Sequence, residues 1–229
     1  MYHYLEDKDF QHKMCSFSGT LMQSVCHHLK TDFDIGATFY LVGSGARNLI
    51  LQNNRQPIDL DYNLEIIRCP DFEDCRHLKG CVKKTFNDCL RSAGLHDCED
   101  SRAVLTSKQI CFRAETPVDY IFFSLNHTST TFTIDICITV RDEKDILYRL
   151  IHEKTGFSYC DRYFWNQAPA SKNLKHKVDY IKSHGQWQRV REQYLKIKNH
   201  YLTHNDHNHP SFICYLEAVN NVYNSRKYW

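Results

Sequence analysis

Two aspartates separated by a single residue are the side chains of this sequence best suited to chemistry. Asp59 and Asp61 lie in Ile58–Ile66, where apolar and polar residues alternate with a period of two. In a β-strand, residues two apart point to the same side and lie about 6.6 Å apart along the chain. Two carboxylates on one face repel each other, and a divalent cation between them turns that repulsion into binding. We therefore predict a site for Mg²⁺, with Mn²⁺ as the alternative ion.

A third aspartate, Asp135, lies in Phe132–Val140, a segment rich in Ile, Thr and Val that we predict to be a strand. An aspartate in such a strand needs a polar or charged partner. If this strand lies beside the strand of Asp59, three carboxylates converge on one or two metal ions. That arrangement orients a triphosphate and lowers the pKa of an attacking hydroxyl. We predict Asp59, Asp61 and Asp135 to be both metal ligands and catalytic residues, with Asp135 assisting deprotonation of the hydroxyl.

A short glycine-containing turn, Gly43-Ser44-Gly45, supplies a second requirement for handling a triphosphate. It follows a predicted strand at Ala37–Val42, and glycine lets backbone N–H groups approach phosphate oxygens closely. We expect Ala46–Gln52 to form a helix whose N-terminal dipole favours the anion. Gly43 and Ser44 are therefore candidate phosphate-binding residues.

The elements that position these residues follow from the spacing of apolar side chains. Besides the strands named above, we predict helices at Phe10–Leu29, Phe72–Ala93 (with a possible interruption at Gly80), Asp142–His152, Lys172–His184, Trp187–Tyr201 and Phe212–Tyr223, a strand at Val118–Leu125, and a hairpin at Arg102–Arg113 turning near Ser107-Lys108. Strands thus concentrate in the first two thirds of the chain. We expect an α+β fold: residues 1–155 form a catalytic domain with a small mixed sheet flanked by helices, and residues 156–229 form a helical domain.

Composition leaves the function open. The 229 residues are 42% hydrophobic and 24% charged, which is typical of a folded globular chain, and the net charge of +2 does not require a nucleic-acid partner. No segment has the roughly 18 uninterrupted apolar residues of a membrane-spanning helix, and Met1–Lys13 is charged where a signal peptide is apolar. We expect a cytoplasmic protein without a membrane partner, whose eleven cysteines are reduced thiols.

Two metal-binding alternatives depend on cysteine and histidine. Cys69, Cys75 and Cys81 recur with His77 among them, but structural zinc sites usually begin from cysteines two to four residues apart. Small helix residues explain these cysteines more simply, although a zinc site stays an open alternative. The second alternative is adventitious metal binding by the histidines at positions 200, 204, 207 and 209. They lie in a polar stretch that is typical of a loop.

The order of these motifs resembles a known superfamily. A strand ending in Leu41-Val42-Gly43-Ser44, a helix, and then Ile58-Asp59-Leu60-Asp61-Tyr62 look like the signature of DNA polymerase β-type nucleotidyltransferases. Within that superfamily, residues 43–49 and 55–61 look most similar to AbiEii-type toxin nucleotidyltransferases. The same turn also occurs in antibiotic-modifying members and in bacterial relatives of cyclic-dinucleotide synthases. The segment Gly45–Ile58 is a little longer than is usual in the family.

The resemblance implies an activity and further site residues. It implies transfer of a nucleoside monophosphate from a nucleoside triphosphate such as ATP to a hydroxyl acceptor, with tRNA or another RNA first and an aminoglycoside- or lincosamide-type small molecule second. A toxin of this type would have an antitoxin protein as partner. The family commonly uses a basic residue on a C-terminal helix, for which Lys172, Lys175 and Lys177 are candidates, and Arg47 is a further candidate phosphate ligand. The rival hypothesis is a non-catalytic module of the same fold that binds nucleotide or a partner protein.

Overall fold

The computed structural model describes residues 1–54, 56–112, 130–169, 173–204, 206 and 210–228. The chain divides into two compact units. The sheet unit comprises Asp7–Ala46 and Arg55–Ala168, and the helical unit comprises Met1–Glu6, Arg47–Asn54 and Pro169–Trp229.

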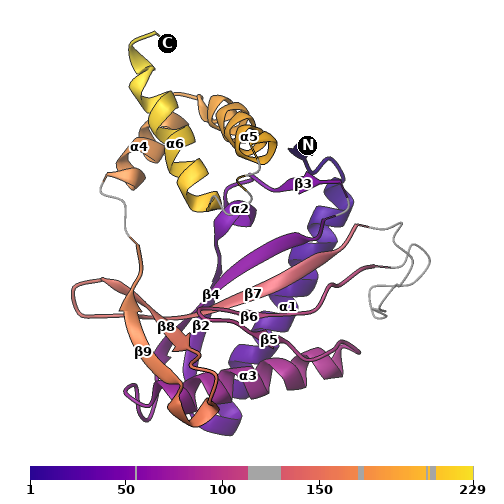
Figure 1. The fold of residues 1–229 in the computed structure, drawn as a ribbon, viewed down its shortest axis with the longest axis vertical. Coiled ribbons are helices and arrows are strands. Elements are labelled where there is room, and N and C mark those ends of the chain that lie inside the picture. Colours follow the sequence, from indigo (N-terminus) through magenta and orange to yellow (C-terminus); the bar gives the residue numbers. More distant parts are fainter. Residues whose placement is uncertain (55, 113–129, 170–172, 205, 207–209, 229) are drawn as a thin grey trace. The chain divides into compact units, whose positions relative to one another are not determined.

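A mixed β-sheet is the centre of the sheet unit (Figure 1). Its strands are β2 (Gly36–Leu41), β4 (Ile58–Arg68), β5 (Glu99–Asp100), β6 (Leu105–Thr106), β7 (Phe132–Arg141), β8 (Leu147–Glu153) and β9 (Arg162–Gln167). They are ordered β2-β4-β7-β6-β5, and β8 pairs with both β7 and β9. Strands β4 and β7 are parallel, whereas the other pairs are antiparallel. The predicted α+β class with a mixed sheet is confirmed.

Strand β4 has one apolar face and one polar face. Ile58, Leu60, Tyr62, Leu64 and Ile66 are buried, and the residues between them are half-buried or exposed. The apolar face packs on helix α1 (Lys8–Phe33), where the Tyr62 side chain meets Ser18 and Cys15. The alternation that predicted the strand therefore also predicted which side carries the aspartates.

Helix α1 is longer than expected because its two ends are capped. The Asp7 carboxylate accepts the backbone N–H of Phe10 at 2.8 Å, and Asp34 ends the helix in the left-handed conformation with φ of 54°. Helix α3 (Cys75–Ser92) begins at Asp74, whose carboxylate accepts the N–H of His77 at 2.9 Å. It runs without interruption through Gly80, contrary to the break that we considered there. Figure 1 shows α1 and α3 side by side, behind and below the strands in this view.

The helical unit contains α4 (Leu174–Ser183), α5 (Trp187–Thr203) and α6 (Ser211–Asn224), followed by the short 3-10 helix η2 (Arg226–Tyr228). It also contains a two-stranded sheet of β1 (Tyr2–Tyr4) and β3 (Leu51–Asn53). Its core includes Leu49, Val190 and Val219. The three helices predicted here are therefore present within a few residues of their expected ends.

The helix predicted at Ala46–Gln52 was wrong. Only the four residues Gly43–Ala46 are helical, as α2, and Asn48 has a left-handed φ of 56°. Leu49 and Ile50 are then buried, and the following residues pair as β3 with the N-terminal strand. Burial of consecutive apolar residues in the other unit overrides their local tendency to continue the helix.

The helix predicted at Asp142–His152 was also wrong, because this segment turns and returns as β8. The Asp142 carboxylate accepts the N–H groups of Lys144 and Ile146, and Asp145 has a left-handed φ of 61°. Strand β9, preceded by the 3-10 helix η1 (Ser158–Cys160), then pairs with β8. Residues 162–167, which we expected in the helical domain, are thus part of the sheet, while the division into domains near residue 155 stays a prediction.

The hairpin predicted at Arg102–Arg113 with a turn near Ser107-Lys108 was wrong, because the hairpin in this region is formed by β5 and β6. Strands β5 and β6 pair across residues 101–104, so the chain turns there. Ser107 is instead bonded to β7, since its N–H donates to the Ile134 carbonyl and its hydroxyl accepts the Ile134 N–H, both at 2.9 Å. The strand predicted at Val118–Leu125 lies outside the described residues. None of the described helices is both long and apolar enough to cross a membrane.

Candidate functional site

The parallel pairing of β4 and β7 brings the three predicted aspartates onto two adjacent strands. Asp61 lies directly opposite Asp135, and Asp59 lies opposite Thr133. Neighbouring strands are about 4.8 Å apart, so cross-strand neighbours on one face are within reach of a shared ligand. The expected adjacency of the two strands is confirmed, whereas the metal-binding and catalytic roles of these residues stay predictions.

Two of the three carboxylates interact with each other and with threonine hydroxyls. The Thr133 hydroxyl donates to Asp59 Oδ1 at 2.7 Å. Burial raises the pKa of Asp135, the neighbouring Thr106 hydroxyl opposes this shift, and the charge of Asp59 adds to it. Asp59 is exposed and Asp135 is half-buried. The face therefore combines like charges with partial desolvation, which favours a cation as an additional partner.

One oxygen of the site is buried without a hydrogen-bond partner. Asp135 Oδ1 is inaccessible and accepts no hydrogen bond from the described residues. An unsatisfied buried acceptor costs about 1–3 kcal/mol, and more when it is charged. Purely structural strands rarely retain such an oxygen, whereas a cation at this position would satisfy it.

Gly43 lies against the Asp61 carboxylate and has no room for a side chain. Its φ is +61°, and a Cβ atom would lie 2.1 Å from Asp61 Oδ2. The following strand is tied to this turn, because the Val42 N–H donates to the Asp61 carbonyl at 2.8 Å. Both the left-handed backbone and the close approach require glycine. The turn and the aspartate are thus one structural unit, as their order in the sequence suggested.

The predicted contribution of a helix dipole to phosphate binding was wrong, because α2 ends after four residues. Ser44 is half-buried within α2. Phosphate binding by Gly43 and Ser44 stays a prediction, and it rests on the backbone N–H groups of the turn rather than on a long helix.

The predicted basic ligands lie in the helical unit or outside the described residues. The Arg47 guanidinium lies 4.5 Å from the Tyr215 ring centroid and hydrogen-bonds to that side chain. Lys175 is exposed on α4, and Lys177 Nζ donates to Asn220 Oδ1 at 2.7 Å. Lys172 lies outside the described residues. Nucleotide binding by Arg47, Lys172 and Lys175 stays a prediction.

The donor set of the three aspartates suits a hard divalent cation, since it consists of carboxylate oxygens. The three carboxylates do not converge on a common position in this structure. Within the described ranges, no three His, Cys, Asp or Glu residues form a metal-binding group. The same finding covers the cysteine segment, where His77 Nε2 lies 3.4 Å from Cys81 Sγ. The unsatisfied oxygen of Asp135 is the feature that fits a metal at the aspartates.

Sequence reasoning missed the threonines that contact the carboxylates. Thr133 lies two residues before Asp135 and therefore shares its face of β7, which is a signal that the period-two pattern contained. Thr106 lies on β6 opposite Asp135, and nothing in the sequence indicated that pairing.

A buried ionic network at the β5 end of the sheet was also missed. Lys79 Nζ lies 2.7 Å from Asp100 Oδ1, and the lysine side chain is only 3% exposed. His152 contacts Asp100 Oδ2 through Nδ1 at 3.2 Å and Asp161 Oδ2 through Nε2 at 2.9 Å. The network joins α3, β5 and β8 to Asp161, the residue before β9, and thereby fixes the β5–β6 hairpin that carries Thr106.

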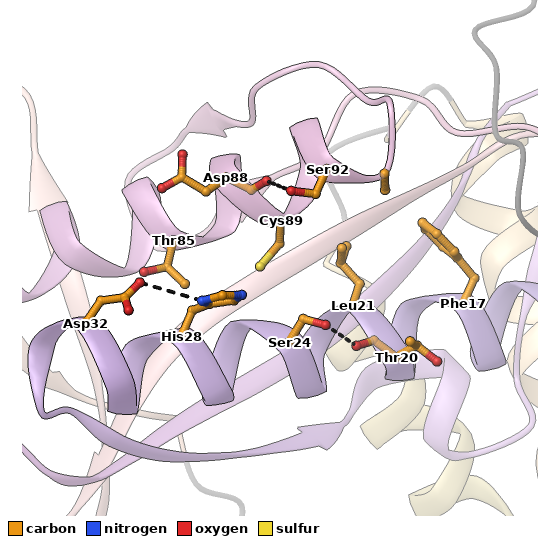
Figure 2. A pocket seen from close by; sticks show the side chains of 11 residues that line it. Phe17, Thr20, Leu21, Ser24, His28, Asp32, Thr85, Asp88, Cys89 and Ser92 are labelled. Atoms are coloured by element: carbon orange, nitrogen blue, oxygen red, sulfur yellow. Dashed lines mark hydrogen bonds and ion pairs between the residues drawn. The ribbon is translucent and has the colours of Figure 1, made fainter.

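A cavity of about 430 Å³ lies between α1 and α3, and none of the three aspartates of the candidate site lines it. Figure 2 shows Leu21, Ser24 and His28 of α1 facing Thr85 and Cys89 of α3 across this cavity. None of the predicted site residues lines it. We therefore place the candidate active site on the polar face of the sheet and not in this cavity.

No protein-family profile matches the chain, and no curated protein matches it significantly. The structure is similar to that of CdnC from E. coli MS115-1 solved with ATP, with a TM-score of 0.56 and 12% identity over 95% of this chain and 61% of that one. A CdnC:HORMA-deltaN complex from the same strain gives a TM-score of 0.51 and 15% identity over 95% and 60%.

A third structure, the CdnE cyclic dinucleotide synthase of Elizabethkingia meningoseptica with GTP and Apcpp, gives a TM-score of 0.49 and 12% identity over 89% and 68% of the two chains. This chain spans about three fifths of the length of the two CdnC chains. At these identities the similarity concerns the fold. Together with the parallel β4–β7 pair and the turn at Gly43, it shows that this chain has the nucleotidyltransferase fold.

Proposed function

We propose that this protein is a metal-dependent nucleotidyltransferase that moves a nucleoside monophosphate from a nucleoside triphosphate to a hydroxyl acceptor and releases pyrophosphate. The observation that carries the proposal is the register that sets Asp61 opposite Asp135 and next to Asp59 on one polar face. The nucleotidyltransferase fold supports it independently of any single residue.

The three aspartates hold Mg²⁺ or Mn²⁺ in this proposal, after side-chain rotations that gather their oxygens. When bound, the cation neutralises phosphate charge and lowers the pKa of the acceptor hydroxyl. Asp59 and Asp61 bind the ion together with the triphosphate, and Asp135 takes part in removing the acceptor proton. Gly43 leaves space beside Asp61, so that the backbone of the turn approaches the phosphates.

The acceptor is the finer part of the proposal. Similarity of the Gly43 and Asp59 motifs to AbiEii-type toxins favours tRNA or another RNA, and it implies an antitoxin as partner. Similarity of the Gly43 turn to that of bacterial relatives of cyclic-dinucleotide synthases suggests the hydroxyl of a second nucleotide instead. An antibiotic acceptor is the remaining alternative that the sequence motifs allow.

Incubation with each α-³²P-labelled nucleoside triphosphate and Mg²⁺ or Mn²⁺ distinguishes these acceptors. One set of reactions contains nucleotides only, a second contains total RNA, and a third contains an aminoglycoside or a lincosamide. Label in RNA supports the toxin-like activity, and a nucleotide product resistant to phosphatase supports oligonucleotide synthesis. Nucleotide binding without pyrophosphate release under all these conditions would support the rival hypothesis of a non-catalytic binding module.

Matched variants connect any product to the site. Asp59→Asn and Asp61→Asn remove one carboxylate each with little change in shape, and both are expected to abolish transfer. Asp145→Asn is the control, because its carboxylate is 85% exposed in the β7–β8 turn. If label transfer were equal in all three variants, the activity would not come from this site.

A further inference from the structure

We propose that Thr133 and Thr106 are positioning residues, which hold the Asp59 and Asp135 carboxylates in the orientation that a divalent cation requires. The inference rests on the proposed function, since it deepens the account of the same site. It concerns residues that the family resemblance did not point to.

The geometry at Thr133 is the first line of support. Its hydroxyl donates to Asp59 Oδ1 at 2.7 Å, which leaves the second oxygen of that carboxylate for another ligand. Thr133 is 8% exposed, and a β-branched side chain in a strand has few available rotamers. The hydroxyl is therefore fixed before any cation arrives.

The second line of support is the equivalent position of Thr106. Each threonine lies on the strand adjacent to its aspartate and directly opposite it: Thr133 faces Asp59 across β4 and β7, and Thr106 faces Asp135 across β6 and β7. Thr106 thus lies beside the Asp135 carboxylate and lowers its pKa against the effect of burial, while Asp135 Oδ1 is buried without a hydrogen-bond partner among the described residues. Thr106 is thus placed to orient the carboxylate, and Oδ1 is left for a ligand.

Strand β6, which carries Thr106, has only two residues and is too short to be rigid by itself. The buried ionic network of Lys79, Asp100 and His152 holds it in place. In β5, Asp100 pairs with Leu105, the neighbour of Thr106. The Asp100 carboxylate contacts Lys79 and His152, and Lys79 Nζ also donates to the Ser101 carbonyl at 2.9 Å. The buried lysine and histidine therefore fix the hairpin from which Thr106 reaches the site.

Hydrogen-bond partners of metal ligands typically change metal affinity by about 10- to 100-fold when they are lost. We expect Thr133→Val and Thr106→Val, which keep the branched shape and remove the hydroxyl, to weaken Mn²⁺ binding by at least about 10-fold. The probe is Mn²⁺ alone, followed by electron paramagnetic resonance of the free ion. Thr133→Ser and Thr106→Ser restore a hydroxyl and are expected to recover most of the affinity.

Thr139→Val is the matched control. This threonine is 1% exposed on the same strand, and its hydroxyl donates to the Leu64 carbonyl at 3.4 Å instead of to a carboxylate. We expect its Mn²⁺ affinity to equal that of the wild type. Thermal melts of all variants verify that they fold, and the serine variants test the role of the hydroxyls should a valine variant fail to fold.

The outcomes separate this inference from the proposed function. If the wild type binds Mn²⁺ and releases pyrophosphate while the valine variants bind Mn²⁺ equally well, the positioning role is overturned and the proposed activity stands. If the wild type neither binds Mn²⁺ nor releases pyrophosphate, both are overturned. Loss of affinity in the valine variants with recovery in the serine variants supports the positioning role.

Discussion

At the scale of single residues, the backbone of Gly43 lies in direct contact with the carboxylate of Asp61. A Cβ atom at position 43 would overlap the carboxylate, and the left-handed φ of +61° adds strain for any other residue. The carboxylate therefore cannot keep its place beside a side chain. The glycine is required by the site and not only by the turn.

Gly43→Ala is expected to displace the Asp61 carboxylate and to reduce pyrophosphate release strongly. The left-handed conformation costs alanine about 1–2 kcal/mol, so a moderate loss of stability accompanies the loss of activity. Pyrophosphate release and chemical denaturation measure the two effects separately.

Gly80→Ala is the matched control for that substitution. Gly80 lies within α3, where an added Cβ atom has no neighbour within 4 Å. Since alanine favours a helix, this variant is expected to gain up to about 1 kcal/mol of stability with activity unchanged. Equal activity in the two variants would contradict the role given to Gly43.

Residue patterns predicted much of the site. Period two placed Asp59 and Asp61 on one face of β4, and an aspartate in an apolar strand pointed to Asp135. The partner hydroxyls were not predictable in the same way, because Thr106 reaches Asp135 only through strand pairing. Cross-strand neighbours distant in sequence leave no periodic signal along the chain.

At the scale of elements, the β5–β6 hairpin depends on a buried ion pair. Removal of Asp100 would leave Lys79, whose side chain is 3% exposed, without its counter-charge. Breaking one side of such a pair typically costs about 3–5 kcal/mol. We expect Asp100→Asn to lower the free energy of unfolding by this order in urea denaturation.

Asp97→Asn is the control for an ion pair at the surface. Arg91 and Asp97 are both 52% exposed, so their attraction is screened by water and salt. A change of at most about 1 kcal/mol is expected. A similar cost for Asp97→Asn and Asp100→Asn would show that burial of Lys79 does not matter.

The same hairpin predicts a dependence of stability on pH. Burial alone would raise the pKa of Asp100, but the Lys79 ammonium and His152 lower it below its ordinary value. A carboxyl group with a lower pKa in the folded state contributes stability above its unfolded pKa, and this is lost as pH falls through the folded pKa.

The wild type should therefore lose more stability than Asp100→Asn when the pH falls from about 6 to about 3. Urea denaturation at several pH values measures the difference between the two proteins. Parallel pH profiles of the two proteins would contradict the assignment of this stability to Asp100.

The two wrong helix predictions have a common cause. Residues 142–152 and 46–52 contain helix-compatible apolar spacing, yet Asp145 and Asn48 adopt left-handed conformations that end local structure. The segments after them then pair with strands remote in sequence. Long amphipathic helices such as α1 were predictable because their burial is periodic along the chain.

At the scale of the whole molecule, the chain passes between its two units more than once. Residues 47–54 leave the sheet unit directly after the Gly43 turn and enter the helical unit, where Leu49 is 1% exposed in the core. The Gly43 turn and the strand that carries Asp59 and Asp61 are thus connected by a segment that belongs to the other unit. Composition and spacing could not predict this excursion, because it depends on where Leu49 is buried.

Leu49→Ala is expected to destabilise the helical unit by about 2–5 kcal/mol, through the cavity that it leaves. Ile67→Ala is the control, since Ile67 is 66% exposed and its truncation should change stability by less than about 0.5 kcal/mol. Thermal unfolding of both variants gives the comparison. A Leu49→Ala variant as stable as the control would show that this segment does not hold the unit together.

Pyrophosphate release from nucleoside triphosphates, measured with Mg²⁺, with Mn²⁺ and with EDTA, tests the central claim most directly. We predict release by the wild type with a divalent cation, none with EDTA, and none from a variant carrying both Asp59→Asn and Asp61→Asn. Release that persisted in that double variant, or no release with any nucleotide and either cation, would contradict a metal-dependent nucleotidyltransferase at this site.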